Sequence, residues 1–344
     1  PPRILPGRRT RVMVRYPGFQ IFDLHENALM RYCVNPQEAY LPCFPPYKRK
    51  GTLAGYVEIC HVLNLVDSKP IDDGSDVMYH YEVTERCVAV KVCQEDKMHE
   101  LQYTNREDPM KEMSIMQLLG TDLPNVGTCI EVLYVPENHG SCHVILPFFG
   151  GGDLHDYMRS RHKNPDDSRI PLKENKAKTL FRDIMTGLRA LHDKGVCHHD
   201  LSASNIMIHH GRAYIIDFGM ALRVPSTRYG RSCLIKPDGA YGKKSYMAPE
   251  IYANREAFDP ESIDAWSARI ILWEMVSGLG SYDLPHTTDK VFKAMTEILP
   301  KCCNEWGVRV SDDCLDLLQN MLKVDDTERL SIDEVLAHPW MQQA

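Results

Sequence analysis

Two short stretches hold the residues that could do chemistry. In GVCHHDLSASNIMI (195–208), Asp200 precedes Asn205 by five positions, and Asp217 follows the apolar run AYII. A carboxylate can accept the proton of a hydroxyl nucleophile. Carboxylate and amide oxygens are also the hard ligands that Mg²⁺ prefers. The three side chains therefore predict proton transfer next to a divalent cation.

Two charged residues upstream extend this chemistry to a phosphate chain. Lys91 ends the strand-like run VAVK, and Glu112 lies in the helix-like segment that follows. Phosphoryl transfer needs the charge of a triphosphate neutralised and the attacking hydroxyl held in line. Lys91 suits the phosphates, and Glu112 can hold Lys91 in place. Either residue alone could be an ordinary strand-edge lysine or solvated glutamate, but the order of the whole set favours phosphoryl transfer.

The elements that must position these residues change in character along the chain. From about residue 55 to 149, runs rich in Val, Tyr, Ile and Cys predict strands separated by turn-forming segments. These runs are YVEICHVLNLV, DVMYHYEV, RCVAVKVC, TCIEVLYV and SCHVILPFF. Between them, PMKEMSIMQLL (109–119) has the apolar period of a helix.

After residue 150 the patterns become mainly helical. KTLFRDIMTGLRALHDKG is amphipathic and meets a stop signal at Gly195, whereas IDAWSARIILWEMVSG is apolar nearly all round and predicts a buried helix. SDDCLDLLQNMLKV and SIDEVLAHPWM each begin with a Ser suited to capping a helix. Residues 1–50 are rich in Pro and Arg and poorly periodic. A β-rich part and a larger helical part should therefore meet near residues 148–152.

Composition narrows the classes of protein that remain. The chain has 344 residues, enough for two lobes, and a net charge of −7 that gives no case for nucleic-acid binding. No apolar run reaches the roughly 18 residues of a membrane helix, and the first residues lack the apolar core of a signal peptide. Twelve cysteines without a CxxC pair favour reduced thiols in an intracellular, cytoplasmic protein. The sequence does not begin with Met, so it leaves open whether a targeting segment lies upstream.

Taken in order, these residues resemble the signature of eukaryotic-type protein kinases over roughly residues 55–341. The signature continues with Asp217-Phe218-Gly219 and Ala248-Pro249-Glu250. The resemblance implies an α+β bilobal fold, with an N-terminal extension (1–54), a small β-rich N-lobe (55–149) and a larger, mainly helical C-lobe (150–344). It also implies transfer of the γ-phosphate of ATP, with Mg²⁺, to a hydroxyl of a protein substrate. It implies no nucleic-acid partner and says nothing of oligomeric state.

The resemblance also assigns roles to single residues. Lys91, Glu112 and Asp200 would be catalytic, and Asn205 and Asp217 would bind the metal. Leu146 would be the gatekeeper, Phe148 and Phe149 would belong to the adenine-binding hinge, and Asp153 would lie near the ribose. The nucleotide-binding set as a whole would be Lys91, Ala89, Gly74, Leu146, Phe148, Phe149, Asp153 and Met207. Asp264 would support the catalytic loop, and Arg329 would pair with Glu250.

The turn expected to hold the phosphates departs from the family pattern. The family carries G-x-G-x-x-G before the strand lysine, but here the span VDSKPIDDGSDV holds a single glycine, Gly74, with Asp72, Asp73 and Asp76 close to it. We therefore expect weak or unusual binding of the nucleotide, and we expect a glycine-rich replacement of 70–76 to tighten it. A second candidate, GTLAG at 51–55, lies too far from Lys91 for a two-strand connection without an insertion.

The catalytic loop departs as well. Ser202 stands where Ser/Thr kinases often carry Lys, and Ser204 where tyrosine kinases commonly carry Arg, so a cation near the γ-phosphate is missing unless another Lys or Arg reaches in. His199 replaces the Arg that binds a phosphate on the activation segment. We hypothesise that activation does not depend strongly on a phosphate there; the alternative is that another basic residue binds it. Lys243 and Lys244 stand where Thr-Pro is common.

Two functions stay open. The complete set of charged residues favours an active protein kinase, and the ending EVLAHPWM favours Ser/Thr acceptors. The alternative is a pseudokinase or scaffold with weak nucleotide binding, because the glycine turn is poor and a cation is missing. Arg269 stands where the buried helix normally has Gly. An Arg in that place needs a partner or a route to water.

Overall fold

A computed structural model gives the fold of two units of the chain. It describes residues 3–4, 11–15, 22–24, 38–43, 50–71, 76–104, 108–135, 140–160, 170–224, 234, 242–255 and 257–342. The contacts divide the chain into unit 1, residues 1–121 and 128–148, and unit 2, residues 122–127 and 149–344. Each unit has its own core and is described by itself.

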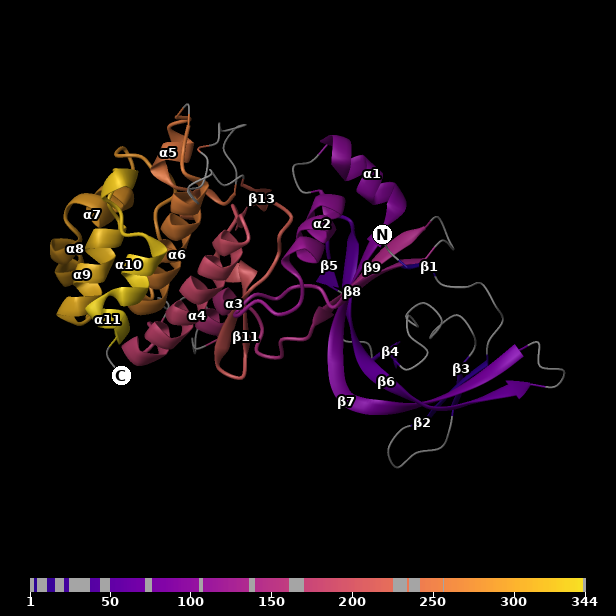
Figure 1. Ribbon diagram of the computed structural model, residues 1–344. Helices are drawn as coiled ribbons and strands as arrows, with labels where there is room; N and C mark the ends of the chain where they lie inside the picture. Colours follow the sequence, from indigo (N-terminus) through magenta and orange to yellow (C-terminus); the bar gives the residue numbers. More distant parts are fainter. Residues whose placement is uncertain are drawn as a thin grey trace. The chain divides into compact units, whose positions relative to one another are not determined.

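Unit 1 is built on one sheet with two helices (Figure 1). Its strands are β1 (Arg3–Ile4), β2 (Arg11–Arg15), β3 (Phe22–Leu24), β4 (Glu38–Pro42), β5 (Lys50–Gly51), β6 (Gly55–Ile71), β7 (Asp76–Gln94), β8 (Glu131–Val135) and β9 (Ser141–Pro147). Its helices are α1 (Glu95–Thr104) and α2 (Pro109–Leu119).

The central strands of this sheet run antiparallel in the order β4-β6-β7-β9-β8. Strands from the first residues join it in parallel pairings, β1 with β8 and β2 with β7. Alternate residues of β4 point to opposite faces of the sheet. Tyr40 packs with the valines of β7, whereas Leu41 packs with Tyr81 and Val83 in a second cluster. The described parts of residues 1–54 thus belong to the sheet of unit 1.

Strands β6 and β7 are unusually long for the sheet of a globular protein, at 17 and 19 residues. The prediction of two separate strands, DVMYHYEV and RCVAVKVC, was wrong: Thr84 and Glu85 between them continue β7 without a turn. The hydroxyl of Thr84 donates a hydrogen bond across to the carbonyl of Val62. The paired strands adjust through register shifts after His61 and after Leu65, which act as β-bulges.

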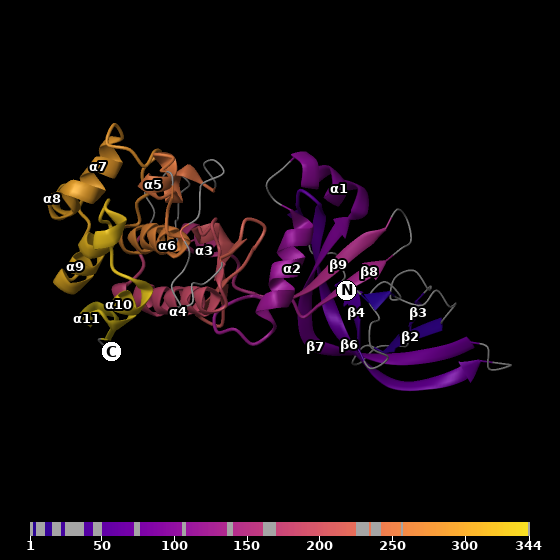
Figure 2. The same cartoon turned by 45° about the horizontal axis from the view of Figure 1, so that its top comes forward.

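Helix α2 begins and ends at the residues that the sequence predicted. Asp108 caps its N-terminus by accepting a hydrogen bond from the backbone of Met110, and Pro109 occupies its first turn, where no N–H partner is lost. Gly120 follows with a positive φ of 77°. Figure 2 shows α2 beside α1, a helix that the sequence did not predict.

Unit 2 is mainly helical. Its helices are α3 (Leu154–Arg159), α4 (Glu174–Asp193), α5 (Pro249–Tyr252), α6 (Pro260–Ser277), α7 (Lys290–Glu297), α8 (Leu299–Glu305), α9 (Asp312–Met321), α10 (Ile332–Ala337) and α11 (Pro339–Gln342). Short 3₁₀ turns occupy Ala203–Asn205, Lys244–Tyr246 and Asp326–Glu328. Two small hairpin sheets pair β10 (Val196–Cys197) with β13 (Leu222–Arg223) and β11 (Ile206–His209) with β12 (Arg212–Ile215).

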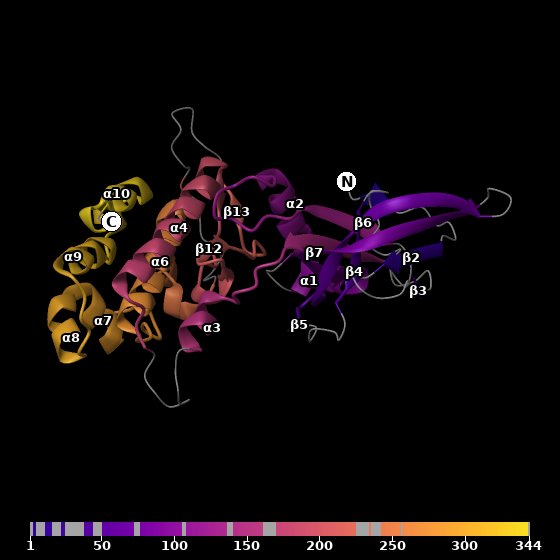
Figure 3. The same cartoon turned by 90° about the horizontal axis from the view of Figure 1, so that it is seen from below.

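Helix α6 forms the centre of unit 2 and packs against α4 (Figure 3). Its side chains are buried on every side from Ile263 to Ser277, as its apolar sequence predicted. Asp259 caps its N-terminus and Gly278, in the left-handed region, ends it. The predicted caps Ser311 of α9 and Ser331 of α10 are present. The α+β class predicted from the sequence is thereby confirmed.

Ten cysteines lie in the described part of the chain, and all ten are free thiols. Nine of them are buried, and burial raises the pKa of several, that of Cys43 and that of Cys93 to about 12. The thiols of Cys43 and Cys93 are therefore neutral at physiological pH. Among the described helices, none combines the length and the apolar content needed to cross a lipid bilayer.

Candidate active site

A buried ion pair in unit 1 joins the sheet to α2. The Lys91 ammonium lies 2.6 Å and 2.9 Å from the two carboxylate oxygens of Glu112, and the side chains are 17% and 8% exposed. The register of β7 places Lys91 opposite Val57 of β6 and Val144 of β9, and α2 presents Glu112 from its first turn. A lysine held by a second charge in this way keeps its ammonium at a defined place on the sheet.

Beside Lys91 the sheet has a partly exposed apolar surface. Ala89 lies two residues before Lys91 on the same face of β7 and pairs in register with Leu146 of β9 and Ile59 of β6. All of these side chains are half-buried. Ile59 and Val57 were missed by sequence reasoning, because only the pairing of β6 with β7 brings them to this face.

The turn GTLAG lies at the Lys91 end of the β6–β7 pair. Gly55 pairs with Cys93, and β5 forms a tight hairpin with β6 in which Thr52 and Gly55 exchange backbone hydrogen bonds. A Cβ added to Gly55 would lie 2.0 Å from the carbonyl oxygen of Val92, so only glycine fits there. Distance in sequence suggested that this turn was a decoy. That interpretation is corrected by the length of β6 and β7, which stay paired from Gly55 and Cys93 to Ile71 and Asp76.

The residues that flank Gly74 in the sequence lie at the opposite end of the same pair. Gly74 itself lies outside the described residues, but Ile71 pairs with Asp76 where the hairpin closes. Asp76 is fifteen residues along β7 from Lys91, about 50 Å of strand at roughly 3.3 Å per residue. We therefore correct the prediction that Gly74 and residues 70–76 grip the phosphates held by Lys91.

In unit 2, Asp264 of α6 anchors the loop that carries Asp200. Its two carboxylate oxygens accept hydrogen bonds from the backbone N–H groups of His198 (2.7 Å) and His199 (2.8 Å). His192 of α4 contributes a third hydrogen bond at 2.9 Å. Burial alone would raise the pKa of Asp264, but the hydrogen bonds and charge of His192 outweigh it, and the pKa is lowered. The loop is thus tied to the most buried helix of unit 2.

Two non-glycine residues of this region adopt left-handed backbone conformations. His199 has a φ of 67° and Asp217 a φ of 70°. Such conformations cost about 1–3 kcal/mol each and are typical of functional sites, where the surroundings impose them. For His199 the imposing contact is the hydrogen bond to Asp264. Its ring lies 5.8 Å from the ring of Phe258, and the residue is only 6% exposed.

Asp200 and Asn205 are in direct contact. The Asn205 amide donates to the backbone carbonyl of Asp200 at 2.8 Å and to its carboxylate at 3.3 Å. Because the amide nitrogen is used in this way, the amide oxygen is the atom that remains for a cation. Burial raises the pKa of Asp200, and the charges of Lys243 and His198 oppose the rise. Asp200 is therefore a carboxylate whose basicity is higher than usual.

Asp217 is the second residue after β12 and accepts a hydrogen bond from the backbone of Gly219. The neighbouring Phe218 is fully buried, and its ring lies 5.6 Å from that of His198. His198 also contacts the carbonyl of Ile216 at 2.9 Å. These contacts join the segment that carries Asp217 to the loop that carries Asp200 within one packed unit.

The predicted nucleotide residues of unit 2 also lie close to one another. Asp153 forms an isolated β-bridge with Met207, and its carboxylate caps α3 through the backbone of Asp156. The ring of Phe149 stacks on that of Tyr214, with centroids 4.7 Å apart. Phe148 belongs to unit 1, with Leu146 and Ala89, and is half-buried.

The pair of Arg329 with Glu250 ties α5 to the chain between α9 and α10. The guanidinium binds both carboxylate oxygens, at 2.5 Å and 2.7 Å, and packs over the ring of Trp266. Arg269 lies beside it and is 1% exposed. Its Nη2 donates to the carbonyl of Leu330, while Nε and Nη1 find no acceptor among the described residues.

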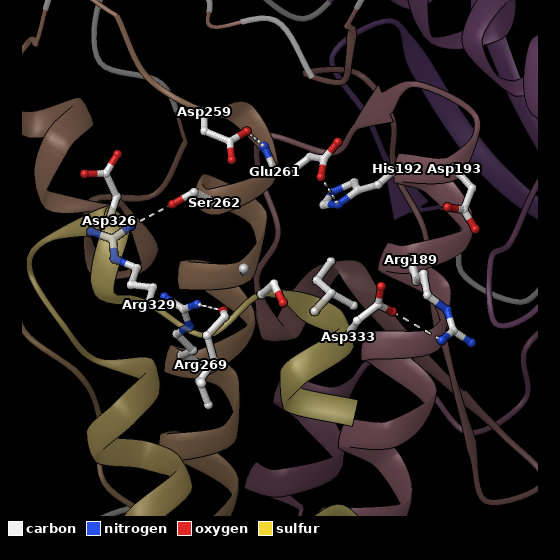
Figure 4. A pocket seen from close by; sticks show the side chains of 14 residues that line it. Arg189, His192, Asp193, Asp259, Glu261, Ser262, Arg269, Asp326, Arg329 and Asp333 are labelled. Carbon is white, nitrogen blue, oxygen red and sulfur yellow. Dashed lines mark hydrogen bonds and ion pairs between the residues drawn. The ribbon is translucent and has the colours of Figure 1, made fainter. Parts of the chain in front are cut away.

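A cavity of about 240 Å³ lies beside Arg269 (Figure 4). Arg269 lines this cavity, together with Arg189, His192, Asp259, Glu261, Asp326 and Asp333. Burial and the neighbouring Arg329 lower the pKa of Arg269, and Glu250 opposes them. The Nε and Nη1 atoms of Arg269 are nevertheless covered by neighbouring atoms, so the cavity does not bring them into contact with bulk water.

The donor set around Asp217 suits a hard divalent cation. One carboxylate and one amide oxygen, from Asp217 and Asn205, match the oxygen ligands of Mg²⁺. Elsewhere among the described residues, Cys43, His61 and Cys87 bring three donor atoms within 4.8 Å of one another. The group of His192, Cys197 and Asp264 is already explained by the ion pair that anchors the loop.

Comparison with known proteins agrees with this geometry. Residues 74–341 match the model of the protein kinase domain family. The chain is 32% identical to Protein kinase kin1 of Schizosaccharomyces pombe over 210 residues, which cover 61% of this chain and 21% of that protein. It is 30% identical to Serine/threonine-protein kinase PEPKR2 of Arabidopsis thaliana over 234 residues, 67% of this chain and 44% of that protein.

A third relative is Probable serine/threonine-protein kinase fhkE of Dictyostelium discoideum, 29% identical over 262 residues. That alignment covers 73% of this chain and 34% of the relative. The chain therefore spans less than half the length of each of these relatives. The family match extends over most of the chain, so the chain belongs to the protein kinase domain family.

Proposed function

We propose that this protein is an active kinase that transfers the γ-phosphate of ATP, with Mg²⁺, to Ser or Thr hydroxyls of proteins. The observation that carries the proposal is the buried ion pair of Lys91 with Glu112, because such a pair holds an ammonium ready for a phosphate chain. Two of the relatives are named as serine/threonine-protein kinases, which supports Ser and Thr as the acceptor residues.

The residues of each unit supply distinct parts of the reaction. In unit 1, Lys91 would bind phosphate oxygens, and the half-buried face around Ala89 and Leu146 would take the adenine ring. The GTLAG turn at 51–55 would take the place of the glycine-rich loop. In unit 2, Asp217 and Asn205 would hold Mg²⁺, which neutralises phosphate charge when bound. Asp200, with its raised pKa, would orient the acceptor hydroxyl and accept its proton.

A phosphotransfer assay tests the proposal. The purified chain is incubated with labelled ATP, Mg²⁺ and a generic protein substrate such as myelin basic protein, beside Asp217→Asn as the matched inactive variant. We expect labelling of Ser and Thr in phosphoamino-acid analysis and its loss in the variant. Phosphotyrosine alone would overturn the acceptor class. Nucleotide binding without turnover would support the alternative, a pseudokinase or scaffold.

The place of action is part of the same proposal. ATP and Mg²⁺ are abundant inside cells, and the described cysteines are free and mostly buried, as in proteins of reducing compartments. We therefore propose an intracellular, cytoplasmic protein with protein substrates. Fractionation of cells expressing the natural full-length protein would test this, and recovery in the secreted fraction would contradict it.

A further inference from the structure

Lys243, which belongs to the activation segment (residues 217–250), contacts the catalytic loop that carries Asp200. The ammonium of Lys243 is 2.7 Å from the hydroxyl of Ser202 and 2.5 Å from the hydroxyl of Ser204. Its backbone N–H lies 3.3 Å from the carboxylate of Asp200. One residue therefore touches three members of the loop, including the carboxylate proposed to act as base.

The two hydroxyls mark the positions where the loop lacks a cation. Ser202 is the second residue after Asp200 and Ser204 the fourth, the places where kinase loops carry Lys or Arg. The Lys243 ammonium lies within hydrogen-bond distance of both hydroxyls. An ammonium has three N–H donors, and the third finds no acceptor among the described residues. A donor is thus left for an anion.

The backbone around Lys243 is shaped for this approach. Gly242 has a φ of 80°, a conformation that side chains with a Cβ rarely adopt. A Cβ at Gly242 would lie 3.0 Å from the carboxylate of Asp200. The glycine lets the segment come close enough for the Lys243 N–H to reach Asp200. Lys244, the next residue, is exposed and makes no such contact with the described part of the loop.

We propose that Lys243 supplies, from the activation segment, the cation that the catalytic loop lacks, and that its ammonium binds the phosphoryl group being transferred. This rests on the proposed kinase function. In the reaction, Asp200 takes the proton of the acceptor hydroxyl, and the hydroxyl oxygen forms the new bond to the γ-phosphorus. The bond from that phosphorus to the bridging oxygen breaks, and its electron pair leaves with ADP. Lys243 stabilises the negative charge and keeps its protons.

The activity of the loop is then linked to the position of the activation segment. A loop with its own lysine keeps the cation wherever the segment lies. Here the cation arrives only when residues 242–243 are folded against Asp200. The site is therefore assembled when residues 242–243 fold against Asp200, and no phosphate on the segment is needed. This agrees with the presence of His199 in place of the Arg that would bind such a phosphate.

Two binding measurements test the contact without turnover. Dissociation constants of Mg·AMP-PNP and Mg·ADP are compared for the wild type, Lys243→Thr and Lys244→Thr. We expect Lys243→Thr to weaken AMP-PNP about tenfold, roughly 1.4 kcal/mol, and to leave ADP unchanged, because only AMP-PNP carries the γ-phosphoryl group. Lys244→Thr, the matched control, should change neither constant. Equal effects on both nucleotides, or none, would overturn the proposal.

Relocating the charge tests the catalytic role. Lys243→Thr should lower kcat by about 10²-fold or more, as loss of one donor to developing charge does, with an unchanged melting temperature. The double variant Ser202→Lys/Lys243→Thr places the lysine in the loop and should recover at least tenfold of the lost rate. A purely structural lysine would give no recovery. If the wild type transfers no phosphate, the kinase proposal fails, and the AMP-PNP comparison still decides the Lys243 contact.

Discussion

At the scale of single residues, we expect the two buried arginines of unit 2 to differ in how much each contributes to the stability of the fold. Arg329 fills both oxygens of a buried carboxylate, Glu250, and donates to two backbone carbonyls as well. Arg269 makes one hydrogen bond and lies close enough to Arg329 for the two charges to repel. Breaking a buried pair from one side leaves an uncompensated charge, whereas Arg269 holds no such partner.

We therefore predict that Arg329→Met lowers the free energy of unfolding by about 3–5 kcal/mol. Arg269→Met, its matched control, should change it by less than about 1 kcal/mol, the worth of one typical hydrogen bond. Chemical denaturation of the two variants and the wild type measures the difference. A loss at Arg269 as large as that at Arg329 would show that the guanidinium in the cavity is structurally required.

His192 should make stability depend on pH. Burial lowers the pKa of His192, but the hydrogen bond and charge of Asp264 raise it by more than burial lowers it. The folded pKa therefore exceeds the unfolded value of about 6.5. A raised pKa adds stability that is complete below the unfolded pKa and disappears as pH rises through the folded pKa. His192→Gln keeps a donor for Asp264 and removes the charge.

We expect the wild type to exceed His192→Gln in stability by about 1.5–3 kcal/mol at pH 6, the range for hydrogen bonds to charged groups. The difference should shrink above the folded pKa. Thermal unfolding from pH 6 to pH 9 checks the trend, with His99→Gln, an exposed histidine of α1, as control. A difference that stays constant with pH would contradict the charged state of His192.

At the scale of elements, the β6–β7 hairpin separates two glycine-containing turns that the sequence alone could not rank. The long pairing of β6 with β7 puts Ile71 and Asp76, which flank residues 72–75, at the far end of the strands and leaves 51–55 beside Lys91. Glycine-rich replacement of 70–76 is therefore now expected to leave ATP affinity unchanged, contrary to the expectation from spacing. Gly51→Val should weaken it severalfold, because the side chain blocks close approach of the backbone to phosphates. Isothermal titration with Mg·ATP compares the two, and Gly51 is suited because a Cβ there meets no atom within 4 Å.

The activation segment leads to a prediction about phosphorylation. His199 is buried beside Phe258 and anchored by Asp264, so its ring is not on an exposed phosphate-binding surface. The sequence offers five hydroxyl residues in 217–250 that a phosphate could modify; Thr227, Tyr229, Ser232 and Tyr241 lie outside the described residues, and Ser245 is half-buried. Phosphatase treatment should therefore leave at least half of the kinase activity. The activity is measured before and after treatment, and mass spectrometry checks that the phosphate has been removed. Abolished activity would favour the alternative, in which another basic residue binds a phosphate.

At the scale of the whole molecule, nucleotide and metal should stabilise the fold together. A ligand that binds only the folded state at 100 times its dissociation constant adds about 2.7 kcal/mol. We predict a higher melting temperature with ATP and Mg²⁺ than with ATP and EDTA. Asp217→Asn should remove the increment that depends on Mg²⁺, because it deletes a charged oxygen ligand. Differential scanning fluorimetry measures both, and an equal increment in the variant would place the metal elsewhere.

The sequence by itself determined the class of protein, most helices and the chemical types at the site. Those features depend on local signals: Pro109 and Asp108 at the start of α2, an all-apolar α6, and charged residues in a fixed order. Only the tertiary structure decided which residues meet across long separations. The register of β6 with β7 places 51–55, and not 70–76, at the end of the strands that carries Lys91. The sequence could not show this, because nothing in the local pattern gives the length over which two strands stay paired. Likewise the side chain of Lys243, some forty residues after Ser202, reaches the loop only because the chain folds back, and spacing alone could not show that contact.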